Sequence, residues 1–179
     1  MARVTRAEIL NAKSDSKLLE LLFAQLSESA PPSLHEDLDR FVVAMGDLPV
    51  GLRAMASTYQ LDVSMALDDL GWHFANWRHH GYCQETSRGL KELGAREVAE
   101  VFDQAYAIAR EHWDEIGEWL QRDASEFAEW YPTSKLHATL EPLNERMWEL
   151  LEEESPGGES GIFRFWLAYA RNHPAGVAP

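Results

Sequence analysis

Apolar side chains recur every three or four residues along most of the chain, which is the spacing of amphipathic α-helices. The longest such stretch covers residues 96–120, where Val98, Phe102, Ala105 and Ile116 fall on one face. No segment shows the sustained alternation of apolar and polar residues that indicates a half-buried strand. We therefore predict an all-α fold of about seven to nine helices, with residues 1–179 forming one compact domain.

Capping residues and helix breakers indicate where the first helices begin and end. Thr5 followed by Glu8, and Ser33 followed by Glu36, have the spacing of a capping box. Between them, the chain is broken by the residues 30–32, which include two prolines. We expect helical structure to begin at Thr5 and to continue into residues 17–26, and a further helix to bury Leu34, Leu38, Phe41, Val42 and Met45.

Glycine and polar residues indicate further breaks in the middle of the chain. We expect a turn at 46–51, helices at about 52–59 and 61–74, a loop at 77–84, and a helix at about 85–93 that ends at Gly94. The segment 96–120 is then expected to form one helix. It is followed by a short helix at 125–130, a helix at about 140–154, a flexible connection at 156–158 and a last helix at 162–171.

Acidic residues are concentrated in one part of the chain. The sequence has 30 Asp and Glu against 16 Lys and Arg, which gives a formal net charge of -14. Residues 97–159 alone hold 17 acidic and four basic residues, a net charge of -13. We expect no direct binding to nucleic acid or to an anionic membrane, because both are negatively charged.

The cysteine content and the N-terminus indicate a cellular location. The lone cysteine, Cys83, cannot form an internal disulfide, and residues 1–13 contain no apolar segment of the kind that a secretory signal needs. We therefore expect a cytoplasmic protein. The signatures of common enzymes, such as a Gly-rich phosphate loop, a nucleophile elbow or a His-Glu-x-x-His helix, are also missing from the sequence, so we expect a non-enzymatic protein without a cofactor.

One group of potential metal ligands lies close together in the sequence. Imidazole, thiolate and carboxylate groups all bind zinc, and all three types occur in this group, which consists of His73, His79, His80, Cys83 and Glu85. Their spacing matches no structural zinc motif, and the alternative is an exposed polar loop at the end of an aromatic helix. We assign no metal to the chain. The third of three functional hypotheses is a metal protein or enzyme centred on His73, His79, His80 and Glu85.

The seven tryptophans suggest a different kind of site. Most of them fall on apolar helix faces, where the indole is expected to pack in the core. Trp148, beside the acidic residues of the same helix, is a candidate anchor for a protein partner, and Phe165, Trp166 and Tyr169 are candidates for a homodimer contact. The second hypothesis is therefore an immunity or antitoxin-like binding module that uses the aromatic surface around Trp148 or Trp166.

Two stripes of acidic residues follow helical spacing. The first contains Glu111, Asp114, Glu115 and Glu118 and is extended by Asp123, Glu126 and Glu129; the second contains Glu141, Glu145, Glu149 and Glu152, with Glu153 beside them. Like charges four residues apart each destabilise a helix by about 0.2–0.5 kcal/mol. Only Arg122 and Arg146 interrupt the stripes. They therefore indicate a functional polyanionic surface, unless the charge serves only solubility.

The charge density of the stripes can be compared with that of DNA. A helix rises about 18 Å from Glu141 to Glu153, a length over which duplex DNA carries about ten phosphates. One stripe is too sparse to match this number, whereas two or three converging helices from residues 97–159 would approach it.

Residues 61–77 and 85–95 resemble the acidic DNA-mimic protein family, most of whose members are catalogued only as a domain of unknown function. The residues that carry the resemblance are Gly71, Trp72, Phe74, Asn76, Gly89, Leu93, Gly94 and Ala95, with Val98, Phe102 and Ala105 beginning the next helix. The motif is structural. We expect Gly71 to lie in a tight turn and Asn76 to bond backbone groups that the turn leaves free.

The resemblance implies an all-α fold that is often dimeric. For the characterised type, it also implies binding to a DNA-binding protein through carboxylates that replace phosphates. The acidic stripes are not part of the family motif and are assigned from this sequence alone. The leading hypothesis combines both: a non-enzymatic protein binds the basic face of a regulator or nuclease through Glu111, Asp114, Glu115, Glu118, Glu141, Glu145, Glu149 and Glu152.

Overall fold

The computed structural model describes residues 4–30, 36–153, 158 and 161–178. These residues form 11 α-helices and no strand, so the predicted all-α fold is confirmed. The predicted number of seven to nine helices is too low. The segment 96–120, predicted as one helix, contains two, and the helical structure predicted from Thr5 onward also consists of two helices.

The helices vary from one turn to five turns in length. In chain order they are α1 (Arg6–Leu10), α2 (Asp15–Ser29), α3 (Leu38–Gly46), α4 (Val50–Leu67), α5 (Leu70–Asn76), α6 (His80–Glu92), α7 (Arg96–Glu111), α8 (Trp113–Arg122), α9 (Ala124–Trp130), α10 (Lys135–Glu152) and α11 (Phe163–Asn172). Short 3-10 turns follow α9, at Tyr131–Thr133, and α11, at Pro174–Gly176. No helix of the described residues is both long and apolar enough to cross a membrane.

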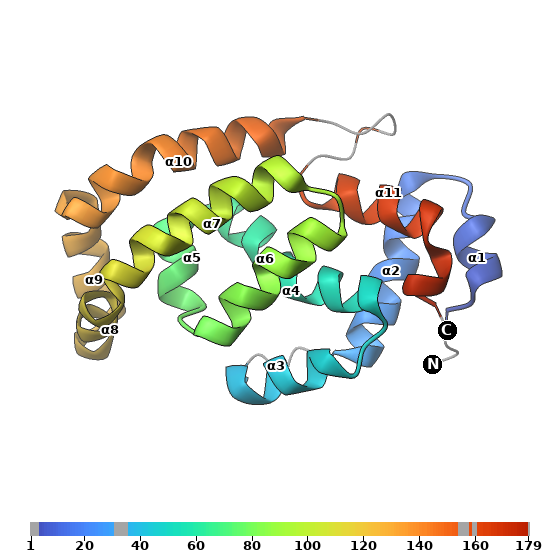
Figure 1. Ribbon diagram of the computed structural model, residues 1–179, viewed down its shortest axis with the longest axis horizontal. Coiled ribbons are helices and arrows are strands. Elements are labelled where there is room, and N and C mark those ends of the chain that lie inside the picture. Colours follow the sequence, from blue (N-terminus) through green and yellow to red (C-terminus); the bar gives the residue numbers. More distant parts are fainter. Residues whose placement is uncertain (1–3, 31–35, 154–157, 159–160, 179) are drawn as a thin grey trace.

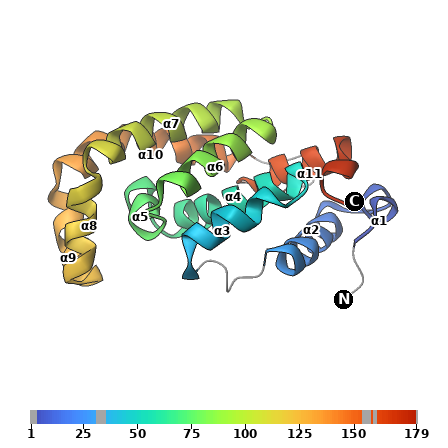
Figure 2. The same ribbon diagram turned by 60° about the horizontal axis from the view of Figure 1, so that its bottom comes forward.

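The central helices lie side by side (Figures 1 and 2). α4 packs along α6, α6 packs along α7, and α7 packs along α10. α1, α2 and α11 form one end of the molecule, where both termini lie, and the Arg6 Nε atom donates to the backbone oxygen of Ala178 there (3.1 Å). α8 and α9 form the opposite end. The buried apolar side chains, which come from all the α-helices, form one cluster.

Local capping explains where several helices begin. Thr5 and Glu8 form the predicted capping box, with Glu8 Oε2 accepting from the Thr5 backbone N–H at 2.8 Å. α3 begins at Leu38, because the Asp37 carboxylate accepts from the Arg40 N–H (3.0 Å). Glu36 therefore lies ahead of this helix, and Ser33 and Leu34 lie outside the described residues. Phe41 and Met45 are buried as expected.

The middle of the chain corrects two predicted boundaries. α4 continues without a break from Val50 to Leu67, so the expected separation near residue 60 is wrong, and the chain breaks at Asp68 and Asp69 instead. Asp69 caps α5 by accepting from the Trp72 N–H (3.0 Å). The expected loop 77–84 is also too long, because the His79 imidazole accepts from the Tyr82 N–H (3.0 Å) and starts α6 at His80.

A side chain from a distant part of the chain fixes the break in segment 96–120. α7 ends at Glu111 and α8 begins at Trp113, on either side of His112. The Arg78 Nε atom donates to the backbone oxygen of Trp113 (2.8 Å), and its guanidinium lies 5.4 Å from the centre of the Trp113 ring. The guanidinium also packs against Gly117, where a Cβ would lie 2.6 Å from it. Arg78 thereby holds α8 at an angle to α7.

The last third of the chain follows the sequence prediction more closely. The helices expected at 125–130 and 162–171 are confirmed as α9 and α11. α10 begins five residues earlier than expected, because the Ser134 hydroxyl accepts from the His137 N–H (3.1 Å), and it continues through Pro142. The connection expected at 156–158 lies outside the described residues except for Gly158.

Candidate protein-binding surface

All the carboxylates of the two predicted stripes are exposed. Met147 and Leu150 bury the opposite face of α10, which leaves Glu141, Glu145, Glu149 and Glu152 in solvent. The first stripe does not form one straight row, because the break at His112 places Glu111 on α7 and the other three residues on α8. It is thus divided between two helices of different direction, which the continuous helix predicted from the sequence did not anticipate.

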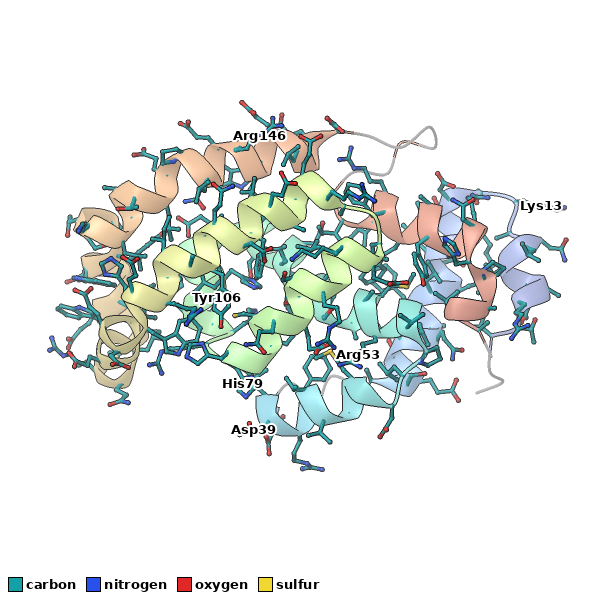
Figure 3. The ribbon with its side chains drawn as sticks, in the orientation of Figure 1. Lys13, Asp39, Arg53, His79, Tyr106 and Arg146 are labelled. Atoms are coloured by element: carbon teal, nitrogen blue, oxygen red, sulfur yellow. The ribbon has the colours of Figure 1, made fainter. Side chains whose placement is uncertain are left out.

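Basic side chains neutralise only part of the acidic surface. Arg146 of α10 (Figure 3) donates to Glu97 of α7 at 2.8 Å and to Glu149 of its own helix at 3.0 Å. Asp114 lies 3.8 Å from Arg78, and Glu115 is bonded to His112 at 2.8 Å. Other exposed carboxylates of α7 to α10 form no ion pair with a described residue, namely Glu100, Glu111, Glu118, Asp123, Glu126, Glu129, Glu141, Glu145 and Glu152. We call this set the unpaired acidic surface.

The first part of the family motif packs the helices that lie behind this surface. Phe74 is fully buried against Phe102 of α7, with ring centres 5.5 Å apart, and Trp72 meets Phe127 of α9 edge-on at 4.8 Å. Gly71 lies inside α5 rather than in the predicted turn. It must be small because a Cβ there would lie 2.1 Å from the hydroxyl oxygen of Tyr131.

The second part of the motif is as expected at the end of α6. Leu93 is buried, and Gly94 has a φ of +81°, a left-handed conformation that glycine adopts without steric cost. Gly89 permits a close approach of α6 to α4. A Cβ at Gly89 would lie 2.3 Å from the Ser57 hydroxyl oxygen and 2.9 Å from the Ala54 backbone oxygen.

A buried polar network supports the same region, and no local sequence pattern indicates it. The Tyr131 hydroxyl donates to Asp69 Oδ2 (2.9 Å), and Asn144 of α10 accepts from the Leu70 N–H (3.0 Å). Burial and the neighbouring Asp69 carboxylate raise the pKa of Tyr131, which keeps its hydroxyl protonated as a donor. Asn76, predicted to bond backbone groups, is exposed, and its side chain forms no hydrogen bond with a described residue. That prediction is wrong, and Asn144 bonds the backbone instead.

A comparison with protein-family models identifies this architecture. The model of the DMP19-like proteins matches residues 46–173, which is more than two thirds of the chain and extends from α4 to α11. The chain belongs to the DMP19-like protein family. Comparisons with curated proteins and with solved structures gave no significant match.

In this DMP19-like protein, the five potential metal ligands do not converge. His73 is buried and bonded to the Ser64 hydroxyl (3.0 Å), His79 bonds to Asp39 (2.9 Å; Figure 3), and His80 bonds to Tyr106 (2.8 Å). Cys83 is buried, and Glu85 pairs with Arg53 (2.7 Å) and Arg88 (2.8 Å). Among the described residues, no three His, Cys, Asp or Glu side chains are placed to hold a metal ion. The metal hypothesis therefore has no site here.

The tryptophans of the second hypothesis have different environments. Trp166 is fully buried and donates to the Thr58 hydroxyl (3.0 Å), and Tyr169 is 7% exposed. Neither can form the predicted homodimer contact or aromatic binding surface, so this part of the prediction is wrong. Trp148 is 38% exposed and donates to the Met65 backbone oxygen (3.0 Å). Of the two tryptophans in the second hypothesis, Trp148 is therefore the one that a partner can contact in the DMP19-like fold.

Proposed function

We propose that this DMP19-like protein is a DNA mimic that occupies the basic DNA-binding surface of a protein partner. The name of the family refers to DNA mimic protein 19, and membership of this family supports a function of this class. The unpaired acidic surface of α7 to α10 is the observation in this chain that carries the proposal. The protein would act by binding alone, without catalysis.

The spacing of the α10 stripe supports the comparison with a DNA strand. Glu141 and Glu152 are separated by a helix rise of about 16 Å. One strand of duplex DNA carries a phosphate about every 3.4 Å of its axis, or about five over this length. The stripe offers four carboxylates: Glu141, Glu145, Glu149 and Glu152. Glu149 is paired with Arg146, so the charge density of the stripe alone is lower than that of one strand. Glu100 and Glu111 of α7, which packs along α10, add unpaired carboxylates.

The mechanism that follows is competition for the same basic side chains. Lys and Arg residues that otherwise contact phosphates would pair with the exposed carboxylates. Long-range attraction between a negative and a positive surface accelerates encounter and weakens as salt is added. Binding to the partner and binding of the partner to DNA would therefore exclude each other, and both would depend on salt.

A pull-down with the tagged chain from the lysate of its own host tests the proposal. The washes use low and moderate salt, and bound proteins are identified by mass spectrometry. We expect a DNA-binding protein that is kept at low salt, lost at moderate salt and displaced by duplex DNA. A partner held equally at both salt concentrations and indifferent to DNA would contradict the mimic and favour a binding module centred on Trp148.

Variants that replace acidic side chains by neutral amides test which residues form the site. We choose Glu141→Gln, Glu145→Gln and Glu152→Gln together, because none of these carboxylates is in an ion pair with a described residue. The matched control changes the net charge equally at exposed positions in α2 and on either side of α3, with Glu28→Gln, Glu36→Gln and Asp47→Asn. We expect the first triple variant to lose affinity at least tenfold and the control to lose much less. Equal losses would mean that only the overall charge matters.

A further inference from the structure

The C-terminal half of α10 borders an apolar cavity that opens at the surface. Its volume is about 290 Å³, and most of its lining is apolar: Met65, Ala66, Trp148, Leu151 and Phe163. Asp62, Glu152 and Gly161 complete the lining. Cavities that hold small-molecule ligands typically measure about 300–1,000 Å³, so this one is at the lower limit for such a ligand. It has ample room for one aliphatic side chain of a protein partner.

The cavity and the acidic stripe share one face of α10. Trp148 is three residues after Glu145 and four before Glu152, and Glu141 lies four residues before Glu145. At this spacing, the exposed Trp148 lies in line with the three glutamates on one face of the helix. Glu145 precedes Trp148 by about one turn, and Glu152 follows it by about one turn and itself lines the cavity. An apolar opening is therefore flanked along the helix by two carboxylates.

This arrangement is complementary to a basic helix. On a helix, positions three or four residues apart lie about 5–6 Å from each other, which is the spacing of the acidic and apolar groups along α10. A partner helix with a leucine-sized side chain between two Lys or Arg residues would insert the apolar group next to Trp148. Its two cations would then face Glu145 and Glu152. DNA-binding proteins commonly present a helix with basic residues to DNA.

We infer that this cavity is a docking site for an aliphatic side chain on a basic helix of the DNA-binding partner. The inference rests on the proposed function and adds to it a contact that DNA phosphates do not provide. It makes part of the affinity independent of salt, since burial of an apolar side chain is not screened by ions. It also lets the protein select one basic partner from others of equal charge.

Two labelled helical peptides test the docking site. Both carry the same Lys residues on one face, and one has Leu between them where the other has Ala. Fluorescence anisotropy at low and moderate salt gives the affinity of each peptide for the full chain. We expect the Leu peptide to bind about tenfold more tightly than the Ala peptide, and we expect this ratio to persist at moderate salt.

The variant Ala66→Gln places a longer neutral side chain at the exposed edge of the cavity and leaves the acidic stripe unchanged. Ala24→Gln, at an exposed position of α2 that does not line the cavity, is the matched control. We expect the preference for Leu to disappear in the first variant and to remain in the second. A preference that survives Ala66→Gln would overturn the docking site.

The outcomes separate this inference from the proposed function. Equal, salt-dependent affinity for both peptides would overturn the docking site and leave the electrostatic mimic standing. A Leu preference that does not change when Glu141, Glu145 and Glu152 become Gln, with the Ala peptide also unaffected, would contradict the mimic and keep the cavity. Failure of both peptides to bind at low salt would overturn the docking site.

Discussion

Burial of His73 makes the protein sensitive to acid. The His73 ring is fully buried, with its Nδ1 atom 3.0 Å from the Ser64 hydroxyl. Burial lowers the pKa of His73 from 6.5 to about 3, because the charged imidazolium would lose its hydration. In the unfolded chain the imidazole regains water and its ordinary pKa. Between pH 6.5 and 3, the unfolded state therefore binds the proton that the folded state excludes.

The size of the effect follows from the two pKa values. Stability is fully present above pH 6.5 and falls as the pH drops below it, by up to about 1.4 kcal/mol per pH unit. Lowering the pH from 7 to 5 should thus remove about 2 kcal/mol through His73 alone. This loss is large compared with the about 5–15 kcal/mol by which natural proteins are stable.

Urea unfolding followed by circular dichroism at pH 7, 6 and 5 measures the loss. The variant His73→Asn removes the titrating group, and its Oδ1 or Nδ2 atom can still bond to Ser64. The variant is less stable at every pH, but its stability should change by about 2 kcal/mol less than that of the wild type between pH 7 and 5. The control Val43→Ala changes an exposed side chain that does not titrate and should keep the wild-type pH dependence. Parallel curves for the wild type and His73→Asn would refute the reasoning.

Two further predictions concern close packing and the free thiol. Gly89→Ala should reduce the free energy of unfolding by about 1–3 kcal/mol, because the added methyl group meets the Ala54 backbone. A Cβ at Gly46 would have no atom within 4 Å, so Gly46→Ala should not reduce the free energy of unfolding in this way. Thermal unfolding compares the two variants. Burial raises the pKa of Cys83 to about 12, so a thiol reagent at neutral pH should label it only in denaturant. Rapid labelling of the folded chain would show that α6 opens readily.

The sequence predicted helix type and surface exposure well, because both depend on nearby residues. The capping box at Thr5 and the left-handed Gly94 are set within one helical turn. The exposure of the acidic residues followed from the periodicity of the apolar ones. The starts of α6 and α10 were placed too late although their caps, His79 and Ser134, are local, whereas the break in segment 96–120 involves a distant residue. The break at His112 depends on Arg78, which comes 35 residues before the carbonyl that it bonds.

The same distinction applies to the site. The stripe Glu141 to Glu152 could be predicted, since one helix displays it. The pairing of Glu149 with Arg146 is also local, whereas the second bond of Arg146, to Glu97 of another helix, could not be predicted. Gly71 was correctly singled out but for the wrong reason, since Tyr131 lies 60 positions away in the sequence and becomes its neighbour only in the fold. The cavity beside Trp148 likewise combines α4, α10 and α11.

The most direct test of the central claim is a competition experiment. A DNA-binding protein recovered in the pull-down is bound to labelled duplex DNA, and the chain is added while the release of DNA is followed by anisotropy. We predict that the wild type and the control triple variant release the DNA, whereas the variant with Gln at Glu141, Glu145 and Glu152 needs at least tenfold more protein. A stable ternary complex of chain, partner and DNA would contradict DNA mimicry.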